Sequence, residues 1–196
     1  MLFCDIILMS INYAGVAIMS KTNNVVFWGL YSIAWLIFVG LSIEAGGLVV
    51  NFCCSLYNPE FVQNLYQKLD LSAMYNQSKW AYFGLYGFIL CISICKAWLF
   101  YIVIRLMHTM DLSKPFSAFV SKQITLISYF TLSIGLLSYV ARQTANNLQH
   151  HGYEIDQLHQ FWVDSEAFVL MAAVVYVIAT IFKKGVAIQN EIDLTV

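Results

Sequence analysis

The stretch that decides the fold is VFWGLYSIAWLIFVGLSIEAGGLVVNFCC, residues 26–54, in which Glu44 is the only charged side chain. A helix needs about 20 mostly apolar residues to cross the hydrocarbon core of a bilayer. A helix at the surface of a soluble protein would instead show one apolar stripe and one polar face. Because this run is apolar on every side, it predicts a transmembrane helix.

Three further runs have the same character. Residues 80–104 contain a single charge, Lys96, and residues 123–141 contain none. Residues 167–182 also lack charges, and they are long enough to span a bilayer if residues 161–166 form an interfacial first turn. We therefore predict an all-α, polytopic membrane protein with four transmembrane helices in a bundle.

The composition indicates the same class. The chain has 196 residues, of which 60% are hydrophobic and 11% charged, with a formal net charge of −1 and a mean hydropathy of +0.71. A soluble domain carries about 25% charged residues. A nearly neutral chain also offers little attraction to a phosphate backbone. We expect the lipid bilayer as a partner and no direct binding of nucleic acid.

The distribution of basic residues predicts the topology. With both termini inside, six basic residues face the cytoplasm and three face outward, which agrees with the positive-inside rule. This predicts a multi-pass protein of the bacterial inner membrane with N-in and C-in topology. The inner set is Lys21, Arg105, Lys114, Lys122, Lys183 and Lys184, and the outer set is Lys68, Lys79 and Arg142.

Residues 1–18 are set apart from this membrane domain. They lack the basic start of a signal peptide and carry Asp5 early. Met19 opens a polar stretch just before the first span, so we expect Met19 to be the physiological start and residues 1–18 to be a non-native extension. The alternative is an amphipathic interfacial segment. Residues 19–196 then form a single four-helix domain, which ends in a short cytoplasmic tail, residues 185–196.

The first outer loop, residues 55–79, is typical of a short helix followed by a turn. Pro59 suits the first position of a helix, and Glu60 suits its positive end. The apolar residues that follow share one side, which predicts a short interfacial helix lying against the membrane surface. They are Phe61, Leu65, Tyr66 and Leu69.

Glu44 and Lys96 form the candidate intramembrane polar site, together with Ser93 and Asn51. An ionisable group at the centre of a bilayer costs about 2.5–3.5 kcal/mol and normally finds a partner inside the bundle. Counted from the outer ends of their runs, Glu44 lies about eight residues deep and Lys96 about sixteen, a mismatch of about 12 Å. Two interpretations stay open: an intramembrane ion pair that supports packing, and a polar site that binds a ligand or relays protons.

Two stripes of small and polar residues indicate close packing of helices. One stripe runs along the first span and contains Glu44, and the other runs along the third span and ends in Arg142. Small residues let membrane helices approach closely, although such a stripe also suits the lining of a polar pathway. The first stripe is Gly40, Glu44, Gly47 and Asn51; the second is Ser121, Thr125, Ser128, Thr131, Gly135, Ser138 and Arg142.

The second outer loop holds the candidate outer-surface polar site, Arg142 with Asp164 and Glu166. Arg142 is placed in the sequence to pair with either carboxylate. Three histidines of this loop are weak metal candidates, because their spacing matches no known ligand pattern and Gly152 interrupts any helix through them. They are His150, His151 and His159. We therefore expect no metal site.

No motif of a known enzyme class occurs in the sequence. None of the cysteines forms the spaced pair at the outer surface that a membrane redox enzyme would use, so we interpret them as small apolar residues. They are Cys4, Cys53, Cys54, Cys91 and Cys95. We expect neither catalysis nor a cofactor, and an intramembrane redox enzyme is the least favoured alternative.

Six short motifs stand out in the sequence: IFKKG at 181–185, IQNE at 188–191, DLTV at 193–196, PFS at 115–117, IEAG at 43–46 and KA at 96–97. Together they resemble a bacterial family of four-helix membrane proteins whose function is unknown, and the resemblance covers about Trp28 to Val196. Ile192 departs from the resemblance, because a polar residue is expected there.

The resemblance also implies a partner. Members of that family are often encoded beside a small Cro-type helix-turn-helix regulator, which implies a membrane protein that binds a transcriptional regulator. The tail suits this role because it combines carboxylates with apolar side chains, although folding back to cap the bundle is an equal alternative. The candidate docking residues are Glu191, Asp193, Leu194 and Val196.

These features favour a non-enzymatic membrane sensor or regulatory protein. A signal received at the outer loop or in the polar interior would change helix packing, and with it the hold of the tail on a partner. The main alternative is a small-solute or ion permease that uses Glu44 and Lys96 as its polar centre. This alternative requires a homo-oligomer, because four helices per chain are few for a transporter.

Overall fold

The computed structural model describes residues 2–57, 72–110, 116–153 and 164–193, with side chains from Val25 onward except at 72–73 and 192–193. Within these ranges every regular element is a helix, so the prediction of an all-α chain is confirmed. The helices are α1 (Leu2–Tyr57), α2 (Ser72–Gln77), α3 (Lys79–Thr109), α4 (Ala118–His150) and α5 (Ser165–Asp193).

Four of these helices are long and apolar enough to cross a membrane. At about 1.5 Å per residue they measure roughly 40–50 Å, which exceeds a hydrocarbon core of about 30 Å. The spans are Val25–Tyr57, Lys79–Thr109, Ala118–His150 and Ser165–Glu191. The chain is therefore a multi-pass membrane protein, and the four predicted spans are confirmed.

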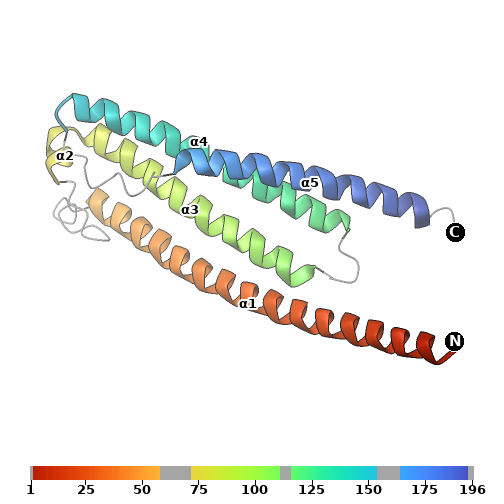
Figure 1. Ribbon diagram of the computed structural model, residues 1–196. Coiled ribbons are helices and arrows are strands. Elements are labelled where there is room, and N and C mark those ends of the chain that lie inside the picture. The colour runs from red at the N-terminus through yellow and green to blue at the C-terminus, as the bar shows by residue number, and fades with distance from the viewer. Residues whose placement is uncertain (1, 58–71, 111–115, 154–163, 194–196) are drawn as a thin grey trace.

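The long helices pack side by side in chain order (Figure 1). α1 packs on α3, α3 on α4 and α4 on α5, while the short α2 packs on α3. Both termini lie at one end of the molecule, which we call the terminal end, and α2 lies at the opposite end, which we call the α2 end (Figure 1). At the terminal end α1 and α5 extend beyond α3 and α4. Residues 2–18, set apart in the sequence analysis, continue α1 without a break.

Two helices contribute seams whose members are alternately four and three residues apart. This spacing is the pattern of helices that pack as in a left-handed coiled coil. Every member of both seams is buried or half-buried. The α1 seam is Ala34, Phe38, Leu41, Ala45, Leu48, Phe52 and Ser55, and the α5 seam is Ser165, Phe168, Ala172, Val175, Ala179, Phe182, Val186 and Gln189.

Aromatic side chains fasten the helices together at the α2 end. Tyr86 of α3 is fully buried, and its hydroxyl donates to the backbone carbonyl of Leu48 in α1 over 3.0 Å. Phe52 of α1 stacks on the Tyr86 ring at a centroid distance of 5.5 Å. Tyr75 of α2 meets Tyr82 of α3 edge-on at 5.2 Å. This aromatic cluster therefore ties α1 and α2 to α3.

The segment between the first two spans contributes α2 to this cluster. Met74 of α2 is 1% exposed and belongs to the core around α3. The predicted interfacial helix over Phe61–Leu69 lies outside the described residues. The helix that the structure describes in this segment is packed against α3 by its own apolar side chains.

Candidate functional site

Two ring contacts define the antiparallel register of α1 against α3. Tyr31 stacks on His108 at a centroid distance of 6.4 Å, and Phe38 meets Tyr101 at 6.3 Å. Seven residues forward along α1 therefore correspond to seven residues back along α3.

This register brings the candidate intramembrane site to one level. Continued for six more residues, it places Glu44 level with Cys95, next to Lys96. The predicted depth mismatch of about 12 Å is wrong, because it was counted from run ends that do not lie at equal heights. Both charged side chains are half-buried, and neither makes a hydrogen bond or an ion pair with the other.

The helix faces explain why the two charges are level and still unpaired. Lys96 follows buried Ile92 by four residues, so it continues the face by which α3 enters the core. Glu44 lies one residue ahead of the α1 seam, at its edge. Ser93 is buried beside Lys96, and Asn51 is half-buried two turns from Glu44. The structure thus places a carboxylate and an ammonium on adjacent helices at mid-span.

The α4–α5 contact is close, and it uses the small-residue stripe of the third span. A Cβ atom added to Gly135 would lie 2.8 Å from Val169 Cγ2 and 3.2 Å from the Ser165 carbonyl oxygen. The Ser128 hydroxyl is buried and donates to the Ala172 carbonyl of α5 over 2.9 Å. These contacts support the packing interpretation of this stripe.

The outer-surface candidates lie at or near the α2-side start of α5. Arg142, Asp164 and Glu166 are all exposed, and no ion pair joins Arg142 to either carboxylate. Asp164 has a left-handed backbone with φ of 75°, and its carbonyl accepts a hydrogen bond from the Phe168 amide over 3.1 Å. Asp164 therefore forms part of the turn that immediately precedes α5.

The histidine candidates lie at the end of α4. His150 and His151 are exposed, and a ring nitrogen of His151 lies 2.8 Å from the Asn147 carbonyl oxygen. His159 is outside the described residues. Among the side chains that the structure describes, no three His, Cys, Asp or Glu residues are grouped to hold a metal.

The thiols of α1 and α3 remain separate. Cys53, Cys54, Cys91 and Cys95 are free cysteines, and Cys53 and Cys91 are exposed on the outer faces of their helices. The side chain of Cys4 is outside the description. This arrangement agrees with cysteines used as small apolar residues.

At the terminal end, the start of α4 holds α5. The Phe116 ring lies against Gly185, where an added Cβ would come within 2.6 Å of it, and meets Phe182 at a centroid distance of 5.2 Å. Ser117 caps α4 by accepting a hydrogen bond from the Val120 amide over 3.2 Å, as its position in the sequence predicts. We call the contact of Phe116 with Gly185 and Phe182 the Phe116 clamp.

The C-terminal candidates follow this clamp. α5 continues as a helix past Gly185 to Asp193, about two turns. Ile188 is 57% exposed and Glu191 is also exposed. The side chain of Asp193, and Leu194 and Val196 altogether, lie outside the described residues.

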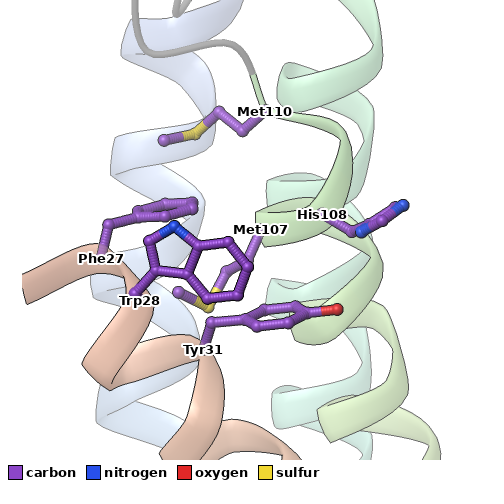
Figure 2. Close-up of a pocket in the computed structure, with 6 residues that line it drawn as sticks. All are labelled: Phe27, Trp28, Tyr31, Met107, His108 and Met110. Carbon is purple, nitrogen blue, oxygen red and sulfur yellow. The ribbon is translucent and has the colours of Figure 1, made fainter. Parts of the chain in front are cut away.

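A small aromatic pocket opens between α1 and α3 near the terminal end (Figure 2). Its volume is about 170 Å³. The rings of Phe27, Trp28 and Tyr31 gather around the Met107 thioether, whereas His108 lies on the side of Tyr31 away from Phe27 (Figure 2). Tryptophan and tyrosine side chains are enriched where a membrane protein meets the water interface, and Trp28 and Tyr31 suit such a position.

Two larger grooves follow the helix contacts within the spans. The α1–α3 groove has a volume of about 420 Å³, and the α4–α5 groove has a volume of about 490 Å³. Sequence reasoning missed both, since each depends on how two helices meet. The α1–α3 groove is lined by Phe38, Ser42, Ala45, Ile94, Ala97, Trp98 and Tyr101, and the α4–α5 groove by Leu136, Tyr139, Ser165, Glu166, Val169, Leu170 and Ala173.

Comparison with known proteins adds a family and no function. No curated protein and no solved structure matches the chain. A family model described as "Protein of unknown function (DUF2975)" matches residues 66–196. The match includes α2 to α5 with Lys96, whereas the expected resemblance over residues 28–65, with Glu44, lies outside it. Because it extends over more than half of the sequence, the chain belongs to the DUF2975 family of proteins of unknown function.

Proposed function

We propose that this protein is a non-enzymatic regulatory protein of the bacterial inner membrane that holds a cytoplasmic partner with the end of α5. In this proposal the terminal end is cytoplasmic, which gives N-in and C-in topology. The basic residues at that end, among them Lys183 and Lys184, agree with the positive-inside rule.

The observation that carries the proposal is an exposed apolar side chain, Ile188, near the end of α5. Beyond the Phe116 clamp the helix continues past the start of α4, and α4 is its main neighbour (Figure 1). Ile188 exposes more than half of its surface there. An exposed apolar side chain on a projecting helix suits a partner that receives a helix in a groove. A small helix-turn-helix regulator is the partner that we propose.

The route of the signal follows from the same helix. α5 runs unbroken to the tail from Ser165, which lies beside Gly135 in the middle of α4. Its extensive contact in the described structure is with α4 alone. A change at the α2 end that shifts α5 along α4 would therefore move the tail as well. Coupling of this kind needs a structural element that can adopt two alternative arrangements. We propose that this element is the packing of α5 on α4.

Affinity purification tests this proposal. The detergent-solubilised full chain and a chain truncated before Glu191 would be isolated from the native host. We expect a small helix-turn-helix protein with the full chain only. Substitution of Ile188 by Asp should also abolish co-purification, whereas Ala187→Asp, on a neighbouring face of the same turn, should retain it. Equal recovery with the full and truncated chains, or no regulator with either, would refute docking on the tail.

A permease is the second candidate, and the level of Glu44 and Lys96 favours it. Two half-buried charges at mid-span on adjacent helices are expected where a solute or ion crosses. This function would use a homo-oligomer. Glu44→Gln should then remove flux in proteoliposomes while truncation before Glu191 leaves flux unchanged. A chain that transports nothing in either form argues against this candidate.

A further inference from the structure

The α4–α5 groove has an apolar wall and a polar head. Leu136 and Tyr139 of α4 form one side, and Leu170 and Ala173 of α5 form the other. All four side chains are exposed at the surface of the described structure, although they belong to transmembrane spans. Glu166 lies in the part of the groove formed by the start of α5, one turn ahead of Leu170. A long molecule with one polar end therefore fits the groove in one direction.

The polar head contains groups that have no partner within the described part of the chain. Ser165 is 2% exposed, lines the groove, and has a buried hydroxyl with no hydrogen-bond partner. Such a hydroxyl costs free energy unless a ligand or water bonds to it. Among the described residues Glu166 forms no ion pair, and Asp164 adds a second unpaired carboxylate two residues earlier. The head of the groove thus offers negative charge.

The net negative charge at the head of the groove indicates the charge of the ligand that it would bind. A helix N-terminus carries roughly +0.5 of an elementary charge and favours anions. Two carboxylates at the start of α5 outweigh this contribution. Arg142 is the nearest basic residue along α4, but it lies seven residues beyond Gly135, about 10 Å further toward the α2 end, and does not line the groove. A cationic head group therefore matches the groove better than a carboxylate does.

We infer that the α4–α5 groove binds an amphipathic amine, with its apolar tail between Leu136 and Leu170 and its ammonium group at Glu166. The ammonium donates to the Glu166 carboxylate. The tail covers apolar surface that membrane lipid otherwise covers. Binding at this groove stands without the cytoplasmic partner; its role as the signal rests on the proposed function.

The α1–α3 groove provides an internal control. It is of similar size, about 420 Å³ against about 490 Å³, and it also lies within two spans. Its lining contains no titratable carboxylate and no buried unpaired hydroxyl. An alkyl chain that merely partitions into apolar grooves would occupy both. A ligand chosen by its ammonium group would occupy the α4–α5 groove alone.

Photolabelling tests this inference on the full-length protein in lipid nanodiscs. The probe is a dodecylammonium derivative with a diazirine in its chain, and labelled peptides are mapped by mass spectrometry. We expect labels on Leu136–Tyr139 and Val169–Ala173, competition by dodecylammonium, and little competition by dodecanol or dodecanoate. Labels shared equally with the α1–α3 groove, or equal competition by dodecanoate, would overturn it.

Matched variants sharpen the test. Glu166→Gln removes the charge from an exposed position and should lower labelling of the groove at least tenfold, about 1.4 kcal/mol of binding free energy. Ala173→Leu should fill the groove and act in the same way, while Ala97→Leu fills the α1–α3 groove and should change nothing. Unchanged labelling in Glu166→Gln, with normal elution on size exclusion, would refute the role of the carboxylate.

The truncation before Glu191 separates this inference from the proposed function. The truncated chain should label as well as the full chain, because the groove lies at the far end of α5. Labelling without any co-purified regulator would leave the amine site standing and remove the regulatory role. A co-purified regulator without labelling of the groove would support the regulatory role and refute the amine site.

Discussion

Substitution of Gly135 by Ala tests whether the α4–α5 contact is as close as its geometry indicates. The new Cβ would lie 2.8 Å from Val169 Cγ2, 3.1 Å from the Val169 amide nitrogen and 3.2 Å from the Ser165 carbonyl oxygen. The valine methyl can rotate away, but the two backbone atoms belong to α5 itself. The helices must therefore separate by a few tenths of an ångström along their seam.

The expected effect combines two terms. Overpacking of a well-packed contact costs about 1–3 kcal/mol. Replacing glycine by alanine in a helix returns about 0.5–1 kcal/mol. The free energy of unfolding should therefore fall by about 1 kcal/mol, which lowers the midpoint of thermal unfolding by about 2–4 °C for a chain of this length.

Gly40→Ala is the matched control, because an added Cβ there has nothing within 4 Å. It should keep only the favourable helix term and raise the unfolding midpoint by about 1–4 °C. Both variants would be measured in the same mild detergent by circular dichroism and size exclusion. If Gly135→Ala raises the midpoint as much as Gly40→Ala does, the close α4–α5 contact is wrong.

Three further predictions concern single contacts. Ser128→Ala should lower the free energy of unfolding by about 0.5–1.5 kcal/mol in denaturant titration, because it removes the buried hydrogen bond to the Ala172 carbonyl. Ser165→Ala is the control and should be neutral or stabilising, because the Ser165 hydroxyl has no partner among the described residues. Equal losses of stability in both variants would contradict the hydrogen-bond assignment. Gly185→Ala should weaken the Phe116 clamp and speed proteolysis of the tail, and Phe116→Ala should relieve the clash in the double variant; a double variant cut faster than either single one speaks against the contact. In a cysteine-free background, Arg142→Cys in intact cells should react with an impermeant maleimide and Lys184→Cys only after permeabilisation; the reverse pattern would invert the proposed topology.

The sequence predicts the spans well because membrane insertion depends on local composition. Each of the four apolar runs lies inside an observed helix, and Ser117 caps α4 where the residue type and position indicate a cap. These features need no knowledge of a neighbouring helix. The small-residue stripe of the third span also indicated correctly that α4 has a close neighbour, although not which one.

The relative heights of the helices could not be predicted in the same way. The register of α1 on α3 depends on which rings meet, Tyr31 with His108 and Phe38 with Tyr101, and no single helix contains that information. Depths counted from run ends therefore misplaced Glu44 against Lys96. The grooves could not be predicted for a related reason. A groove forms where large side chains of one helix meet small side chains of another, and the sequence of one helix does not say which residues it meets.

The agreement between chain order and spatial order has a consequence for biogenesis. Each long helix contacts the one that precedes it, so a span that leaves the ribosome finds its partner already in the membrane (Figure 1). No extensive contact among the described helices waits for a later span, which keeps the contacts local and favours rapid assembly. α5 is added last, onto a surface that α4 already presents. A chain released after α4 should therefore insert and keep its α1–α3–α4 contacts, and α5 is the one span that can dock after synthesis is complete.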